Sequence, residues 1–160
     1  MCFLKIHKCA EKKTVCMATK TSLLQNNAKK IWSQFMPRRN SIKHKKNTSF
    51  LSIQVYPKGL DMADFTPQTE FITRAGIEVT NLSLIPEGMD SFIIPQGLYA
   101  IFEHQGATRD FHKTSKYIYE EWLPTSGYVL DDRPHFEVLD ERYLGPDHPD
   151  SIEDVYIPIL

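Results

Sequence analysis

The alternation of apolar and polar positions predicts two helices. In the first, apolar residues recur at the spacing of one helical face from Leu24 to Phe35, so we expect a helix from Ser22 that Pro37 ends. Gln25 stands three positions after Ser22, the spacing of a capping box. A second apolar face predicts a helix over about 110–123, ended by Pro124. The two faces comprise Leu24, Ala28, Ile31, Trp32 and Phe35, and Phe111, Ser115, Ile118, Tyr119 and Trp122.

Strand-like segments flank each helix. Six segments have the alternation or the composition of strands, namely 3–9, 49–56, 71–79, 98–104, 134–139 and 154–160. Gly76 weakens the third segment, and 91–95 is a short additional extended piece.

The elements follow the order strand, helix, strand, strand twice, in halves of about 1–80 and 90–160. A half of this size buries little apolar surface alone, so we expect both halves to form one domain over 1–160. The sequence therefore predicts an α+β fold of duplicated βαββ modules. It would have an antiparallel sheet, two helices on one side and a central ligand groove between the modules.

Charge is distributed unevenly along the chain, although the net charge is only −1. Residues 1–60 hold thirteen Lys or Arg and one acid, whereas residues 61–160 hold six bases and nineteen acids. The densest basic segment is Arg38–Lys46, which is typical of a solvated loop. It lacks interleaved aromatic residues, so direct nucleic-acid binding is not expected, whereas a protein partner remains possible.

Several classes of protein and site are not expected. No apolar run approaches the roughly 20 residues that span a bilayer, and charges interrupt the start of the chain too early for a secretion signal. Cys2, Cys9 and Cys16 form no paired motif, which favours reduced thiols and a cytoplasmic protein. No metal, phosphate-loop, cofactor or catalytic-triad motif is present.

Glu137 is the main candidate for chemistry. It lies in a strand-like segment in which Phe136 and Val138 share one face and Glu137 the other. If Phe136 and Val138 pack under the helices, Glu137 faces the groove, as a counter-charge for a cation or as a general acid or base. The alternative is a surface glutamate. Glu78 is its approximate counterpart in the first half, with the same alternative.

Aromatic residues could form the walls of this groove and stack against a planar or cationic ligand. Packing in the core is the alternative for each of them. The candidates are Tyr99, Phe102, Tyr117, Trp122 and Tyr156.

Six segments of the chain together resemble the GyrI-like small-molecule-binding family. They are IWSQFMPR at 31–38, PEGM at 86–89, IPQGLYAIF at 94–102, WLP at 122–124, RPHFE at 133–137 and VYIPI at 155–159. The family includes effector-binding domains of AraC-type and multidrug-sensing transcription activators. The resemblance implies the duplicated fold, a ligand contact at Glu137 and a position beside the groove for Tyr99. Residues 72–76 depart from the family pattern.

Three functions follow from these residues and this resemblance. The first is a stand-alone sensor or sequestering domain that binds hydrophobic, aromatic or cationic small molecules. The second is a hydrolase of strained, cyclopropane-bearing toxins, with Glu137 as the acid or base and Tyr99 or Glu78 assisting it. The third is a protein-interaction inhibitor, as in the gyrase inhibitor that gives the family its name.

Overall fold

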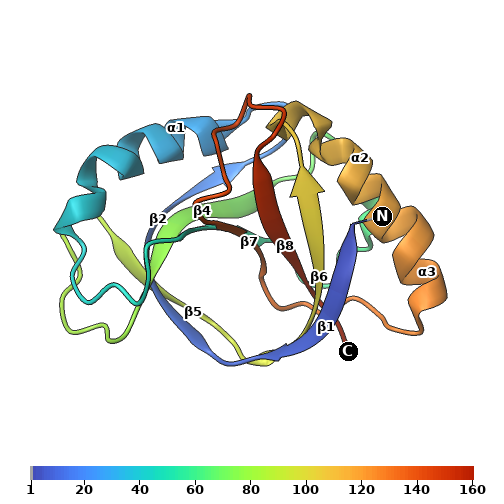
Figure 1. Cartoon of the computed structure of the whole chain (residues 1–160), viewed down its shortest axis with the longest axis horizontal. Helices are drawn as coiled ribbons and strands as arrows, with labels where there is room; N and C mark the ends of the chain where they lie inside the picture. The colour runs from blue at the N-terminus through green and yellow to red at the C-terminus, as the bar shows by residue number, and fades with distance from the viewer. Residues whose placement is uncertain (1) are drawn as a thin grey trace.

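The protein is an α+β fold, built on one antiparallel sheet of eight strands in the order β1-β6-β8-β7-β3-β4-β2-β5. The computed structural model describes residues 2–160. Two helical segments lie on the same side of the sheet (Figure 1). This confirms the expected class, the antiparallel sheet and the two helices. The strands are β1 Phe3–Cys9, β2 Lys12–Thr21, β3 Phe50–Val55, β4 Phe71–Val79, β5 Asp90–Ile94, β6 Gly97–Gln105, β7 His135–Leu139 and β8 Ile152–Pro158.

The strand order has a pseudo-two-fold symmetry. It reads the same from both ends if β1, β2, β3 and β4 are matched with β5, β6, β7 and β8. Each repeat therefore has two strands before its helix, one more than expected. The counterpart of Phe3–Cys9 is β5, and not the strand that contains Leu98 to His104. The first strand of each repeat pairs with the other repeat, β1 with β6 and β5 with β2.

Strand β2 was not predicted from the sequence. Its middle residues Thr14, Val15 and Cys16 are all buried, so apolar and polar positions do not alternate. Thr14 satisfies its hydroxyl by donating to the carbonyl of Phe92 at 2.6 Å. The neighbouring strand β4 needs Gly76, because a Cβ there would lie 2.9 Å from the Cβ of Cys16.

The first helix, α1 (Asn27–Phe35), begins later than expected. Ser22 and Gln25 form a turn in which the backbone N–H of Gln25 donates to the Ser22 hydroxyl at 3.2 Å. Asn26 then takes a left-handed conformation before the helix. The α-helix ends before Pro37 as expected, and a 3-10 turn, η1, continues from Met36 to Ser41.

The second helical segment runs past Pro124. It consists of α2 (Phe111–Lys116), the π-helical turn η4 (Tyr117–Trp122) and α3 (Leu123–Ser126). In the π turn the N–H of Leu123 donates to the carbonyl of Ile118, five residues back. Pro124 stands at the start of α3, where its missing N–H needs no partner, and Gly127 ends the helix in a left-handed conformation.

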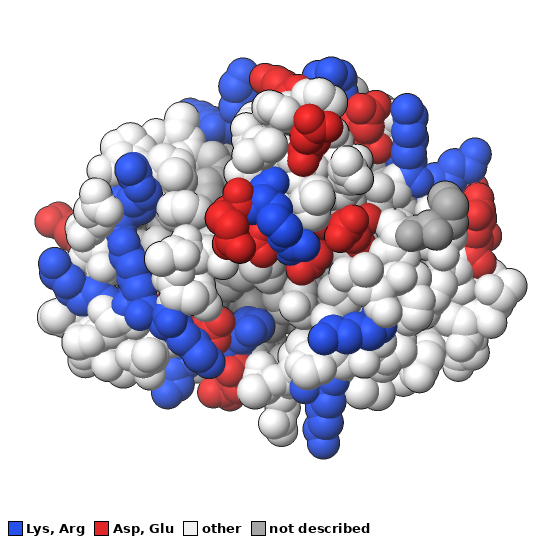
Figure 2. Space-filling model, in the orientation of Figure 1, with Lys and Arg blue, Asp and Glu red and all other residues white. Residues whose placement is uncertain are grey.

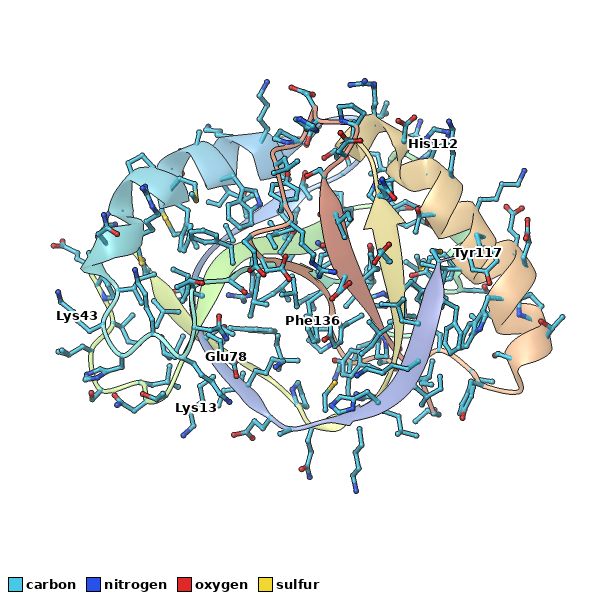
Figure 3. The ribbon with its side chains drawn as sticks, viewed as in Figure 1. Lys13, Lys43, Glu78, His112, Tyr117 and Phe136 are labelled. Carbon is cyan, nitrogen blue, oxygen red and sulfur yellow. The ribbon has the colours of Figure 1, made fainter. Side chains whose placement is uncertain are left out.

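Both faces of the sheet carry buried apolar clusters. One face packs under α1 through Phe35 and under the second helical segment through Ile118. The other face carries a third apolar cluster that includes Ile53 and Phe136. Figure 3 shows Phe136 and Glu78 inside the curve of the sheet, on the side away from the helices.

The basic segment Arg38–Lys46 is tied to the sheet at its end. The N–H of Lys46 donates to the carbonyl of Glu78 at 2.9 Å, and Lys45 forms a bridge with Val79. On the face shown in Figure 2, basic and acidic side chains are interspersed, with several basic ones in succession at the left. None of the helices formed by residues 2–160 is long and apolar enough to cross a membrane.

Candidate ligand-binding site

The symmetry axis passes between Ser52 and Glu137. These residues are paired between the central strands β3 and β7. The flanking pairs, Leu51 with Val138 and Ile53 with Phe136, exchange places under the symmetry. Ser52 is therefore the counterpart of Glu137, which corrects the expectation that Glu78 is.

Glu137 faces the helix side of the sheet. In the ladder it lies opposite Ser52, and Ser52 lies opposite Ala75, which packs in the cluster under α1. Phe136 and Val138 belong to the other face. They do not pack under the helices, because the curved sheet buries a separate cluster on its far side.

The Glu137 carboxylate lacks a cationic partner. Gln54 donates to it through Nε2 at 2.9 Å, and it takes part in none of the ion pairs among residues 2–160. Burial raises the pKa of Glu137 to about 7, against the opposing effect of hydrogen bonds from Gln54 and Ser52. An acid that is poorly solvated and unpaired favours either a proton or a bound cation.

Tyrosines and a neutral histidine lie beside Glu137. Burial, and then the charge of Glu137, raises the pKa of Tyr56 well above its usual value. The pKa of Tyr119 is raised by burial and by the charges of Tyr56 and Glu137. The Tyr119 hydroxyl lies 3.3 Å from Nδ1 of His135, whose pKa burial lowers to about 3. These groups are neutral at neutral pH, so none of them supplies a positive charge to Glu137.

Further aromatic rings extend the site beyond Tyr56. The Tyr56 ring centroid lies 4.8 Å from the ring of His135, 5.0 Å from that of Phe71 and 5.8 Å from that of Phe65. Phe71 begins β4, and Phe65 lies in the link between β3 and β4. This end of the site therefore offers several aromatic faces and edges to an apolar ligand.

A second acid, Glu153, lies on the same face. It pairs with His104, whose ring contacts Phe111 and Thr114 of α2. Burial, and then the charge of Glu137, raises the pKa of Glu153 to about 8. Burial, and then the charges of Glu153 and Glu137, raise the pKa of Tyr143 in the link between β7 and β8.

Three of the expected site residues lie on the far face of the sheet. Tyr99 is fully buried there and donates its hydroxyl to the carbonyl of Pro134 at 2.8 Å. Tyr156 stacks on Phe136, with ring centroids 4.4 Å apart. Glu78 forms ion pairs with Lys12 and Lys46, each at 3.5 Å. The sheet separates these three side chains from Glu137.

Three others lie under the second helical segment. Phe102 is buried, with its ring centroid 5.1 Å from that of Trp122 and 6.4 Å from that of Tyr117. Trp122 also stacks on Phe3 at 5.1 Å. Figure 3 places Tyr117 beneath this helix. Of the seven expected residues, Glu137 alone lies at the axis.

The residues that surround Glu137 were not predicted from the sequence. Tyr119 was assigned to the apolar face of the second helix, and the π turn is the local feature that the periodicity does not show. Glu153 falls just before the expected start of the last strand. Alternation from Val155 would have placed Glu153 on the same face as that residue.

Two curated relatives are similar in sequence. BrlR, a transcriptional regulator of Pseudomonas aeruginosa, is 34% identical over 131 residues, which cover 81% of this chain and 45% of BrlR. A DNA gyrase inhibitor of Erwinia billingiae is 35% identical over 80 residues, covering 47% of this chain and 49% of the inhibitor. The chain thus spans about half the length of each.

Solved structures share the fold at low sequence identity. SAV2435 bound to tetraphenylphosphonium has a TM-score of 0.75 at 13% identity, covering 100% of this chain and 94% of that one. EcmrR in its DNA complex has a TM-score of 0.73 at 12% identity, covering 97% of this chain and 56% of EcmrR.

The family model for the GyrI-like small molecule binding domain matches residues 4–160, which is nearly the whole chain. Its extent agrees with the eight-stranded sheet and its two helical segments. The chain therefore belongs to the GyrI-like family of small-molecule-binding domains.

Proposed function

We propose that the protein binds hydrophobic cations on the helix side of its sheet, with Glu137 as the counter-charge. The observation that carries this proposal is the half-buried carboxylate of Glu137, which lies between the two repeats and has no basic partner among residues 2–160. Tyr56 and Tyr119 beside it supply aromatic surface for stacking and for cation–π attraction. A cation that enters replaces the missing partner of the carboxylate, so binding and ionisation of Glu137 favour each other.

Family membership and one relative support this reading. The family is defined by small-molecule binding. SAV2435, which shares the fold, is bound to tetraphenylphosphonium, an aromatic cation. A cation of this kind would place its charge at Glu137 and its rings against the aromatic end formed by Tyr56, Phe65 and Phe71.

The test is titration of the protein with tetraphenylphosphonium, followed by calorimetry or tryptophan fluorescence. Glu137→Gln retains the shape of the side chain and an acceptor for Gln54, but removes the charge. We expect it to weaken binding at least about ten-fold, since it leaves a desolvated cation unpaired. Glu121→Gln, on the exposed side of the second helical segment, is the control for net charge and should bind as the wild type does.

An uncharged probe separates charge recognition from loss of the site. Triphenylphosphine oxide has similar rings and no net charge, so its affinity should change little in Glu137→Gln. Equal affinity of wild type and Glu137→Gln for tetraphenylphosphonium would contradict the proposal.

The hydrolase is not proposed. Tyr99 and Glu78, which were expected to assist Glu137, lie on the opposite face of the sheet, where Tyr99 is packed and Glu78 is paired with two lysines. A water or substrate held by Glu137 is therefore out of reach of either group.

A further inference from the structure

Glu153 is the diagonal neighbour of Glu137 on the helix side of the sheet. Glu137 pairs with Val155 between β7 and β8, and Glu153 stands two residues before Val155 in β8. Side chains two residues apart in a strand share a face, and diagonal neighbours are roughly 7–8 Å apart at their Cα atoms. The two carboxyl groups therefore lie near each other on this face, and the charge of Glu137 raises the pKa of Glu153.

Neither acid forms an ion pair with a basic side chain of residues 2–160. Glu153, like Glu137, takes part in none of the ion pairs of residues 2–160, and its side chain has no hydrogen-bond donor among them. The adjacent Asp154 points to the other face and pairs there with Arg142 at 2.8 Å. The chain thus supplies an arginine to the acid beside Glu153 and none to Glu153.

The acids are confined to one side of the symmetry axis. Ser52, the counterpart of Glu137, pairs with Ala75, so the counterpart of Glu153 is Thr73, two residues before Ala75 in β4. The first repeat offers hydroxyl groups where the second offers carboxylates. The site consequently has an aromatic end at Tyr56 and His135 and an acidic end at Glu153 and Tyr143.

We propose that Glu153 is a second ligand-binding residue and that the site selects elongated aromatic ligands with two cationic centres. One centre would pair with Glu137 and the other with Glu153. The inference rests on the proposed function, since it assigns the class of ligand to the same site. Unlike the proposed function, it requires a ligand with a second positive charge.

Two probes of nearly equal size test the second charge. Methyl viologen is a flat dication with one charge in each of two linked rings, and 1-methyl-4-phenylpyridinium has the same two-ring frame with one charge. We expect wild type to bind the dication at least about ten-fold more tightly at pH 8 and low salt. Glu153→Gln should bring the two affinities within about two-fold, mainly by weakening the dication.

The two variants separate this inference from the proposed function. Glu137→Gln should weaken both probes, whereas Glu121→Gln, the exposed control, should change neither. Binding of tetraphenylphosphonium and the monocation that depends on Glu137 would support the proposed function. In that case, the second-charge inference fails if wild type does not prefer the dication, or if Glu153→Gln still prefers it. If no cation binds the wild type, both fail. Circular dichroism of each variant confirms that it is folded.

Discussion

At the scale of single residues, Glu137 couples protonation to stability. Its pKa is raised from an ordinary value of 4.5 to about 7, so the folded state holds a proton that the unfolded state has released. The stability that this proton contributes is fully present below about pH 4.5 and is lost as the pH rises through about 7. The groups that face Glu137 are Tyr56, Tyr119, His135, Glu153 and Tyr143.

Glu137→Gln should therefore reduce the fall in stability between about pH 5 and pH 8. We expect wild type to lose roughly 1–3 kcal/mol more than the variant over this range, including the part due to repulsion of Glu153. Urea unfolding at both pH values measures the difference. Glu121→Gln, with the same loss of charge, should follow the wild type, and an equal slope for all three proteins would contradict the prediction.

The position of Glu137 follows from the sequence in part. Alternation separates it correctly from Phe136 and Val138. It does not say which face the helices cover, because both faces of the curved sheet are apolar. Tyr56 and Glu153 could not be joined to Glu137 from the sequence, since the pairing of β3 with β7 and of β7 with β8 brings them together.

At the scale of elements, the close approach of β2 to β4 depends on Gly76. An added Cβ would lie 2.9 Å from the Cβ of Cys16 and 3.1 Å from the carbonyl oxygen of Val15. We expect Gly76→Ala to lower the free energy of unfolding by roughly 1–3 kcal/mol, as overpacking does. Chemical denaturation measures this loss.

A second substitution tests the cause. In a Cys16→Gly background the contacting Cβ is absent, so Gly76→Ala should cost less than it does in the wild type. A double-mutant cycle gives this difference. The same cost in both backgrounds would mean that Cys16 is not what excludes the alanine.

The elements that the sequence predicts well are those whose pattern matches their burial. The segments 3–9 and 71–79 were predicted with the bounds that the structure has. Strand β2 was missed because Thr14 and Cys16 are buried on the face opposite Val15. The second helix was ended too early, because the π turn shifts its hydrogen bonds before Pro124 and so tolerates the proline.

At the scale of the whole molecule, the two repeats depend on each other. Strand β1 pairs with β6 and β5 pairs with β2, so each repeat completes the sheet of the other. We expect fragments 1–84 and 85–160 to be unfolded when separate and to fold when mixed in equal amounts. Near-ultraviolet circular dichroism and cooperative denaturation follow the assembly. A fragment that unfolds cooperatively on its own would show that the repeats are independent.

The arrangement of strands around β6 also has a mechanical consequence. β1 and β8 flank β6, and both run antiparallel to it. Phe3, near the start of the chain, lies opposite Phe102, whereas Pro158, near its end, lies opposite Tyr99. A force that draws the two ends of the chain apart therefore slides β1 and β8 along β6 in opposite directions. The hydrogen bonds of both ladders then carry the load together instead of opening one after another.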